Sequence, residues 1–403
     1  LRAFKNMSKQ FFFEAGAFPD LSYVELIAVL ESFNISKDII TRFGTTIFLV
    51  KNEKIDENFV INVFQRLGGC KRVGYIIEDI DNFSYRSESI QGNKIIFGIS
   101  ILGDSLKNES VFIKKLANSI KRTLRSDAIS SRFIIPKGKD NSLNSAQVIN
   151  NQIIEKGFEL DILRNFETEK YGKTLMVQDL EGFVQRDMYK PNTDIQMGTL
   201  PPKLARMMVN FTAQNSGILW DPFCGSGTIP MEAVILGFNT LASDVNPVAV
   251  NTTSSNIEWL SKEGFAPDAL YESFRFDVTK ANKGVIKKLK NTDITAIVCE
   301  PYMGPPQTAL LSEQKASELL IDVKNLYFKL FDLIDNKIEK RHIKVVLIIP
   351  SYKTQKGWKT FGIRELVNKR WIVKNGDYLK NRDLKWSRKN SIITRNIFIL
   401  ERT

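Results

Sequence analysis

The sequence predicts an α/β protein whose C-terminal half is a doubly wound sheet with helices on both faces, preceded by an α+β region. Three strand ends indicate the sheet. The run I-L-W-D-P-F-C-G-S-G-T-I-P (218–230) reads as a strand, a glycine turn and a helix with proline in its first turn. A further strand ends in Asp244, and a strand over 294–299 ends before Glu300. Because the first and fourth strands of a doubly wound sheet are neighbours and ligands bind at their carboxyl ends, Asp221 and Glu300 are expected to face one site.

The composition suits a globular protein with a polyanionic partner. The chain has 403 residues, which suggests two or three domains, and 43% of them are hydrophobic. The formal net charge is +12 and the pI is near 9.4, which favours RNA or DNA as a partner; a generally basic proteome is the alternative. No apolar run is long enough to cross a membrane and no signal peptide is visible, so no membrane partner is expected.

The cysteines and the single histidine argue against several kinds of site. Cys70, Cys224 and Cys299 are far apart and have neither disulfide nor metal-ligand spacing, which favours a reducing, cytoplasmic setting. His342 lies among basic residues and is expected on the surface. Since one histidine cannot build a Ser-His-Asp triad or a histidine metal site, no metal is expected.

The N-terminal part alternates strands and helices. This alternation is typical of a small ferredoxin-like module, expected over residues 1–80. In its first helix Glu25 shares a face with Ala28 and Ser32, opposite the apolar side that is expected to face the core. Residues 1–6, which precede Met7, are given no role. Strands are expected over 10–15, 45–50 and 73–80, and helices over 23–33 and 57–67.

Two basic segments are expected to contact nucleic acid. The first combines a strand over 94–102, a basic helix over 107–124 and a strand that begins at Arg132. The second, 351–403, interleaves cations with tryptophan and tyrosine. Both fit a nucleic-acid strand, the alternatives being a solvated helix face and core tryptophans. The candidate RNA-binding residues are Lys114, Lys121, Arg132, Lys137, Lys385 and Arg388.

The residues around the glycine turn indicate its ligand. The lysine of a triphosphate-binding loop is absent, and Pro230 stands where a dinucleotide fingerprint has its third glycine. Asp221 at the strand end would repel a pyrophosphate but attract an ammonium group and ribose hydroxyls. S-adenosylmethionine carries an ammonium, a carboxylate, a sulfonium and a ribose but no phosphate. It is therefore the expected cofactor, and an ordinary strand–turn–helix corner is the alternative.

Further residues are expected to line this cofactor site. Asp244 lies about twenty residues beyond the glycines, where an acid can bind ribose hydroxyls. Asp277 ends a strand expected over 273–276 and is placed either to accept from the adenine amine or to cap the next helix. The loop 194–203 either closes over the methionine part of the cofactor or only connects domains. The expected cofactor-binding residues are Pro201, Asp221, Phe223, Gly225, Gly227, Thr228, Asp244, Val245, Asp277 and Glu300.

Several motifs resemble one family. F-G-I-S-I-L, R-F-I-I-P, L-N-S-A-Q-V and K-G-F-E-L resemble the THUMP domain, an RNA-binding module. The runs 177–191 and M-G-T-L-P-P-K-L-A-R-M-M (197–208) resemble the join into the methyltransferase domain of THUMP-containing tRNA guanosine-N2 methyltransferases. The resemblance implies a ferredoxin-like module (1–80), a THUMP domain (81–170), a linker (171–196) and a Rossmann-like class I methyltransferase domain (197–403).

The same resemblance implies a function. A THUMP domain would hold the acceptor end of tRNA, and S-adenosylmethionine would methylate guanine N2 at a D-stem-type site. A small activator subunit is a further candidate partner that no motif in the sequence specifies.

A second motif, E-P-Y-M-G-P-P, begins at Glu300. Related amine methyltransferases have here an acid or asparagine, two prolines and an aromatic residue. The acid accepts from the target amine, the ring stacks on the base, and the methyl group moves by in-line displacement. Glu300, Pro301 and Tyr302 are therefore the expected catalytic residues. Because glutamate stands first and Tyr302 comes one place early, adenine-N6 methylation, a catalytically silent RNA-binding subunit and a purely structural turn remain alternatives.

Overall fold

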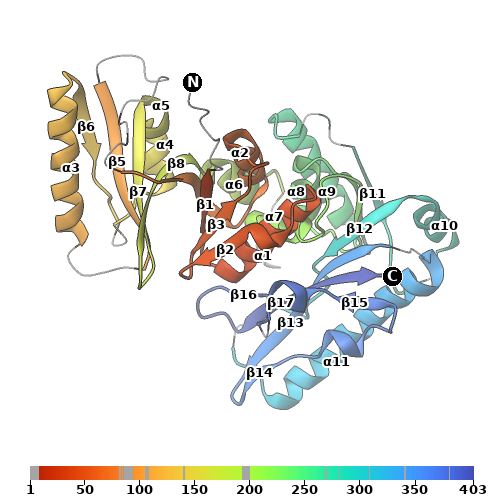
Figure 1. The fold of residues 1–403 in the computed structure, drawn as a ribbon. Helices are drawn as coiled ribbons and strands as arrows, with labels where there is room; N and C mark the ends of the chain where they lie inside the picture. The colour runs from red at the N-terminus through yellow and green to blue at the C-terminus, as the bar shows by residue number, and fades with distance from the viewer. Residues whose placement is uncertain are drawn as a thin grey trace. The chain divides into compact units, whose positions relative to one another are not determined.

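The chain divides into two compact units (Figure 1). The first contains the described residues up to Tyr23 and Ser36–Gly182, and the second contains Val24–Ile35 and Phe183–Thr403. The structure is a computed structural model. It describes residues 9–80, 83, 85, 94–104, 109–138, 141–192, 200–266, 268, 270–280, 282–307, 309–339, 342–380 and 382–403.

An eight-stranded mixed sheet forms the first unit, in the order β2-β3-β1-β4-β8-β7-β5-β6. Strand β5 is parallel to β6 and β7, and the other neighbours are antiparallel. The strands are β1 (Gln10–Ala15), β2 (Ile40–Phe43), β3 (Ile47–Lys51), β4 (Cys70–Ile77), β5 (Lys94–Gly103), β6 (Ser130–Ile134), β7 (Gly157–Arg164) and β8 (Glu169–Val177). The helices from this part of the chain are α1 (Pro19–Ser32), η1 (Lys37–Ile39), α2 (Glu57–Arg66), α3 (Glu109–Ser126), α4 (Ser145–Asn150), α5 (Ile153–Lys156) and α6 (Leu180–Val184), of which α1 and α6 extend into the second unit.

Strand β8 corrects the predicted domain boundaries. It pairs with β7 on one side and with β4 on the other, so the modules expected over 1–80 and 81–170 share one sheet. The predicted linker 171–196 is wrong at its start, because 171–177 belong to β8. Polar residues are spread along this strand and only three of its positions are buried, so the apolar alternation that marks a strand is weak. Residues 193–196 of the predicted linker lie outside the described residues.

Helices cover both faces of the β5–β7 part of the sheet (Figure 1). On one face Ile113 and Ile120 of α3 pack with Ile95 and Phe97 of β5. On the other face residues of α4 and α5 pack against Ile96 of the same strand. Successive side chains of a strand point to opposite faces, which is why this apolar strand is covered twice. The basic side of α3 is left exposed to solvent.

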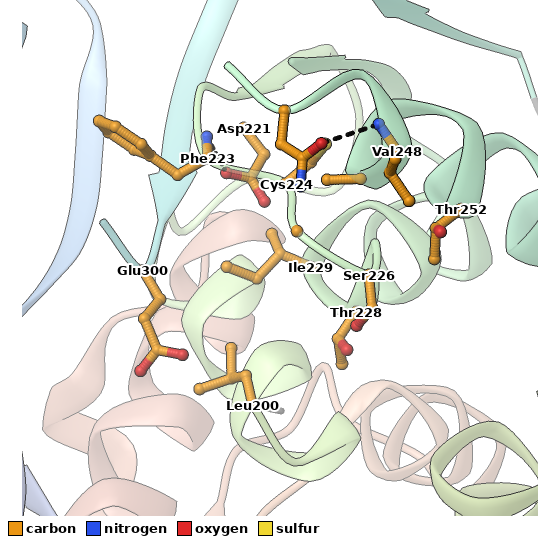
Figure 2. A pocket seen from close by; sticks show the side chains of 13 residues that line it. Leu200, Asp221, Phe223, Cys224, Ser226, Thr228, Ile229, Val248, Thr252 and Glu300 are labelled. Atoms are coloured by element: carbon orange, nitrogen blue, oxygen red, sulfur yellow. Dashed lines mark hydrogen bonds between the residues drawn. The ribbon is translucent and has the colours of Figure 1, made fainter. Parts of the chain in front are cut away.

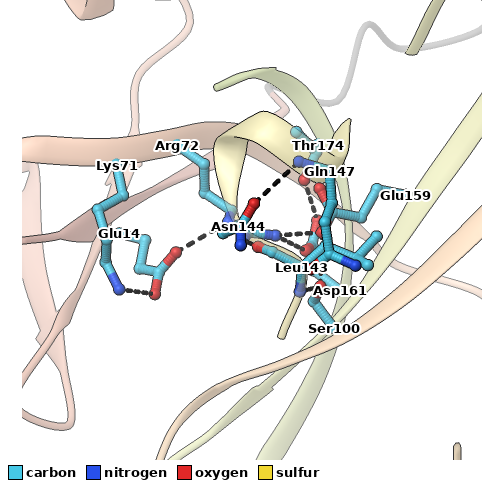
Figure 3. Close-up of polar contacts among 10 residues, drawn as sticks. All are labelled: Glu14, Lys71, Arg72, Ser100, Leu143, Asn144, Gln147, Glu159, Asp161 and Thr174. Atoms are coloured by element: carbon cyan, nitrogen blue, oxygen red, sulfur yellow. Dashed lines mark hydrogen bonds and ion pairs between the residues drawn. The ribbon is translucent and has the colours of Figure 1, made fainter. Parts of the chain in front are cut away.

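A buried polar cluster crosses this sheet around Arg72 of β4 (Figure 3). Nε of Arg72 lies 2.8 Å from Glu14 Oε2, and Nη1 contacts Glu159 and lies 3.1 Å from Asp161 Oδ1. Nη2 donates to the carbonyl oxygen of Leu143 at 2.6 Å. Arg72 is 4% exposed, and Glu159 and Asp161 are fully buried. One guanidinium therefore compensates carboxylates from β1 and β7 and holds the chain at Leu143 against the sheet.

The second unit contains the doubly wound sheet, in the order β11-β10-β9-β12-β13-β17-β15. Strands β9 to β13 run parallel, while β17 is antiparallel to β13 and β15. The strand order reverses beside β9, and β9 and β12 are neighbours, which confirms the prediction that Asp221 and Glu300 lie at adjacent strand ends. The strands are β9 (Ile218–Asp221), β10 (Asn239–Asp244), β11 (Tyr271–Arg275), β12 (Ile294–Cys299), β13 (Lys344–Thr354), β14 (Gly357–Lys359), β15 (Trp371–Val373), β16 (Lys385–Trp386) and β17 (Ile393–Arg402).

Helices also cover this second sheet. One face forms a core in which Trp220 of β9 and Ile297 of β12 pack with Val323 and Tyr327 of α11. Helices α7, α8 and α9 contact the sheet from its other side (Figure 1). None of the described helices is both long and apolar enough to span a membrane. The helices are η2 (Gln185–Tyr189), α7 (Pro202–Asn210), α8 (Thr228–Ile235), α9 (Pro247–Lys262), α10 (Lys283–Asn291), α11 (Glu313–Asp332), η3 (Leu333–Ile338), η4 (Ile363–Glu365) and α12 (Asn375–Tyr378).

The second half of α1 belongs to this unit although it lies far upstream in the sequence. The expectation that Glu25 lies on the side away from the core is wrong. Glu25 is fully buried, and Asn210 Nδ2 of α7 donates to its Oε1 at 2.8 Å. Glu31 accepts from the hydroxyl of Tyr378 at 3.1 Å. Glu25 is therefore an internal polar residue that is satisfied by a hydrogen bond rather than by solvent, whereas Glu31 and Ser32 of α1 are half-buried.

Candidate active site

The glycine turn between β9 and α8 is held by backbone hydrogen bonds. Phe223 N donates to Asp221 Oδ1 at 3.0 Å, and Gly227 N donates to the carbonyl oxygen of Cys224 at 2.7 Å. Gly225 and Gly227 have φ of +52° and +83°, which favour glycine. A Cβ on Gly227 would meet Thr253 Oγ1 at 2.9 Å, whereas a Cβ on Gly225 would meet no described atom within 4 Å. Gly227 therefore serves packing, and Gly225 leaves open space in front of the turn.

Two cavities adjoin this turn and share Phe223, Gly225, Asn246 and Glu300. The smaller has a volume of about 190 Å³ (Figure 2) and the larger about 440 Å³. The smaller is also lined by Leu200, Asp221, Cys224, Ser226, Thr228, Ile229, Val248, Ala249 and Thr252. The larger is also lined by Pro222, Asp244, Val245, Phe276, Asp277, Val278, Pro301, Tyr302, Met303, Gly304, Pro305, Pro306, Leu326 and Ile393.

Carboxylates are the charged groups that line these cavities. Asp221, Asp244, Asp277 and Glu300 contribute to the walls, and none of the described lining residues is lysine or arginine. Burial raises the pKa of Asp221 well above its ordinary value; the Phe223 hydrogen bond opposes this, and the charges of Asp244 and Glu300 add to it. The walls therefore favour a ligand that carries positive charge and disfavour a phosphate.

Asp244 and Asp277 already make hydrogen bonds within the protein. Asp244 Oδ2 accepts from Gly225 N at 3.1 Å and its Oδ1 from Asn246 N at 2.9 Å. Asp277 Oδ1 accepts from the backbone nitrogen and the hydroxyl of Thr279, at 3.0 and 2.6 Å. Asp277 thus holds the following turn and lines the larger cavity. The alternative that it caps the next helix is wrong, because α10 begins at Lys283 and Asn282 caps it.

The loop after β12 is held in one shape. The Tyr352 hydroxyl of β13 donates to the carbonyl oxygen of Met303. Gly304 has a φ of +85°, and a Cβ there would meet the same hydroxyl at 2.3 Å. Tyr302 is 55% exposed and lines the larger cavity. The loop therefore presents an accessible aromatic ring beside Glu300.

Glu300 stands at the junction of the two cavities and is paired with a residue that the sequence argument missed. Arg395 Nε of β17 donates to Glu300 Oε1 at 2.5 Å. The two side chains are 13% and 16% exposed, respectively. Burial raises the pKa of Glu300, while the charge and hydrogen bond of Arg395 act against that rise. The alternation of side chains along a strand predicts that Arg395 and Ile393 lie on the same side of β17. The sequence does not show that this side reaches the site, because that depends on the pairing of β17 with β13.

Most of the predicted cofactor-binding residues come together, but two do not. Pro201 precedes α7 and lies outside both cavity walls, whereas its neighbour Leu200 lines the smaller one. Gly227 also lies outside both walls. Asn246 and the α9 residues Val248, Ala249 and Thr252 were missed, although Asn246-Pro247 is a typical helix start and helical spacing from it could have placed them near the turn.

The candidate RNA-binding residues lie at the surface. Lys114 and Lys121 are exposed on α3, and Arg132 and Lys137 are exposed at and after β6. Lys121 Nζ lies 6.0 Å from the centre of the Phe133 ring. In the second unit Lys385 is exposed and paired with Asp383 at 2.8 Å, and Arg388 is exposed. Their exposure leaves these side chains accessible to a nucleic-acid partner.

Comparisons with known proteins bear on this site. Residues 191–299 match the family described as "RMKL-like, methyltransferase domain". The chain is 39% identical, over 62 residues, to a tRNA (guanine(10)-N2)-dimethyltransferase from Methanothermobacter thermautotrophicus, covering 15% of this chain and 18% of that protein. It is 32% identical, over 134 residues, to the protein of the same name from Methanocaldococcus jannaschii, covering 32% of this chain and 37% of that protein.

The chain therefore matches less than two fifths of the length of these curated relatives. A solved rRNA methylase from Streptococcus thermophilus is similar at a TM-score of 0.31 and 15% identity, over 51% of this chain and 98% of that one. The region 191–299, which matches the methyltransferase-domain family, holds the glycine turn, Asp221 and Asp244. Parts of the chain are also similar to enzymes named for guanine-N2 dimethylation of tRNA.

Proposed function

We propose that this protein transfers methyl groups from S-adenosylmethionine to the exocyclic N2 amine of guanine in tRNA. The observation that carries the proposal is the place of Glu300. It lies in the wall of both cavities beside the glycine turn, directly after a region that matches a methyltransferase domain. An acid at the position of Glu300 faces both the cofactor and the target amine.

The residues of the site fit the cofactor. Its ammonium and sulfonium groups are positively charged, and the described charged groups in both walls are carboxylates. Asp221 and the open face at Gly225 would hold the methionine part. Asp244 would accept from the ribose hydroxyls, and Val245 and Asp277 would hold the adenine. When bound, S-adenosylmethionine supplies an electrophilic methyl group.

The residues of this chain would orient the amine. Glu300 accepts hydrogen bonds from the N2 hydrogens and so aims the nitrogen lone pair. Tyr302 offers an exposed ring in the same cavity, on which an unstacked guanine can lie. As the nitrogen gains the methyl group it loses a proton, which the hydrogen-bonded carboxylate of Glu300 can receive. Orientation of this kind and a positioned base each accelerate such reactions.

Transfer RNA is supported as the substrate by three observations. The curated relatives are named as tRNA methyltransferases. The net charge of +12 suits a polyanion. The first unit, whose motifs resemble the THUMP domain, carries exposed cations on α3. We further propose that this unit holds tRNA as a THUMP domain with its N-terminal ferredoxin-like module.

Mass spectrometry of nucleosides tests the function. Purified protein is incubated with S-adenosylmethionine and unmodified tRNA transcripts, and the digested nucleosides are compared with those from the Glu300→Ala variant. N2-methylguanosine or N2,N2-dimethylguanosine formed only by the native chain supports the proposal. Formation of N6-methyladenosine would show that adenine, and not guanine, is the target base. If the protein binds the cofactor but forms no methylated nucleoside, the result would favour a catalytically silent RNA-binding subunit.

Substituting Gly225 should weaken cofactor binding. Valine at Gly225 would fill the open space in front of the turn, so we expect affinity for S-adenosylmethionine to fall roughly tenfold or more, about 1.4 kcal/mol. Gly237→Val is the matched control, because Gly237 also has a positive φ and open space but lies outside both cavities. Calorimetry in which both variants, still folded, bind the cofactor equally well would contradict the assignment.

Charge reversal on α3 should weaken tRNA binding. The variant Lys114→Glu/Lys121→Glu is expected to bind tRNA less tightly at low salt and to reduce the salt slope by about one for each lost phosphate contact. Lys287→Glu/Lys329→Glu makes the same charge change on exposed residues of α10 and α11. Filter binding at several salt concentrations measures the tRNA affinity of the two double variants. Equal losses in both variants would show a general charge effect and refute a specific role for α3.

A further inference from the structure

Arg395 lies in the strand that borders Glu300. In the β13–β17 ladder it stands opposite Pro350, and in the β16–β17 pair it stands opposite Trp386. Ile393, two residues earlier on β17, lines the larger cavity. Since alternate residues of a strand share a face, β17 directs both Ile393 and Arg395 toward the Glu300 edge of the sheet.

The guanidinium of Arg395 is held on two sides. Its Nε donates to Glu300 Oε1 at 2.5 Å, and its Cζ lies 5.0 Å from the centre of the Trp386 ring. Both members of the ion pair are largely buried. Exposed ion pairs are weak because both side chains must be ordered in water. Here the Trp386 ring and the pairing of β17 already hold Arg395 in place, so its ion pair can fix the position of Glu300.

We propose that Arg395, held by Trp386, is a positioning residue that fixes Glu300 as an ionised acceptor for the target amine. The inference rests on the proposed function and deepens it. Glutamate has one more rotatable bond than the aspartate or asparagine that usually begins this motif. The hydrogen bond at Oε1 removes that freedom and presents Oε2 as the second acceptor oxygen. Arg395 thus explains how a longer acid can occupy this position.

The charge of Arg395 also has a consequence for pH. Among the described residues, Glu300 interacts electrostatically with Asp221 of β9, Cys299 of β12, Tyr327 of α11 and Arg395 of β17. Burial favours the neutral form of Glu300, and Arg395 opposes this. Loss of the arginine should therefore raise the pKa of Glu300 further. Because an ionised Glu300 is needed, the acid limb of the pH–rate profile should move to higher pH.

The test measures single-turnover methylation of tRNA as a function of pH. In Arg395→Gln the rate at neutral pH is expected to fall about tenfold or more. The acid limb should move up by about one pH unit or more, the effect of removing a close opposite charge. Arg395→Lys should restore part of the shift because it restores the charge. Arg364→Gln, which removes an exposed arginine outside both cavities, should change neither quantity.

A second readout separates this inference from the proposed function. The carboxyl carbon of Glu300, labelled with ¹³C and assigned with Glu300→Gln, can be titrated by NMR without any RNA. A higher pKa in folded Arg395→Gln supports the pair even if no RNA is methylated. An unchanged pKa and an unmoved acid limb would overturn the positioning role, whether or not the rate falls. Thermal unfolding and cofactor affinity confirm that each variant is intact.

Discussion

Glu300→Ala is expected to lower the single-turnover rate of tRNA methylation by about a hundredfold or more while binding of tRNA and cofactor persists. The variant removes the proposed acceptor for the target amine and leaves the glycine turn, Asp221 and Asp244 in place. Rapid-quench methylation with labelled cofactor gives the rate, and calorimetry gives the two affinities.

Glu365→Ala is the matched control for this prediction. Glu365 Oε2 also lies 2.5 Å from a cation, Lys324 Nζ, but the pair lies outside both cavities. If Glu300→Ala methylates at nearly the native rate, the E-P-Y-M-G-P-P loop is structural. If both variants lose activity equally, the loss comes from general damage and not from the missing acceptor.

Arg72→Met is expected to destabilise the first unit by about 3–5 kcal/mol, the usual effect of breaking a buried ion pair from one side. The substitution keeps a similar volume but leaves Glu14, Glu159 and Asp161 without their common partner. Urea unfolding monitored within the first unit gives the change in free energy. Lys71→Met is the control. Lys71 pairs with the same Glu14 at 2.7 Å but is 52% exposed, so its loss should change stability by less than about 1 kcal/mol.

The loss of stability caused by Arg72→Met should also depend on pH. Burial raises the pKa of Asp161 and the charge of Glu159 adds to this, whereas Arg72 lowers it. Without Arg72 the folded-state pKa rises further above the unfolded value. An acid shifted in this way stabilises the fold while protonated, and the stabilisation is lost as pH rises through the folded-state pKa. The difference in free energy of unfolding between the native protein and Arg72→Met should therefore grow as pH rises. An equal difference at low and high pH would mean that the loss of Arg72 does not disfavour the ionised form of the buried acids.

The features that were predictable from the sequence are those carried by short stretches. Asp221 and Gly225 follow from local turn chemistry, and the structure has Asp221 at the end of β9 and Gly225 in the turn before α8. The capping role of Asn246, which precedes α9, is equally local. The adjacency of Asp221 and Glu300 followed from the strand order of a doubly wound sheet.

The features that escaped prediction depend on contacts between distant residues. Arg395 stands 95 positions after Glu300, and nothing in its own strand marks it as a partner. Glu25 was assigned to solvent because a polar residue on a helix usually faces water, yet its partner Asn210 is 185 positions away. The residues of β8 look like a linker because their burial comes from the pairing with β4 and β7.

The divided origin of the second unit has a consequence for how the chain is made. Most of helix α1 and the three residues after it supply Val24–Ile35 to this unit, whose other residues begin at Phe183. During synthesis α1 leaves the ribosome early, but the Tyr378 hydroxyl that binds Glu31 arrives 347 positions later. The first unit, by contrast, has its residues available once Gly182 has emerged, and domains tend to fold in the order in which they are made. We therefore expect the first unit to fold on the ribosome before the second unit, which can form its Glu31–Tyr378 contact only after Tyr378 has been made.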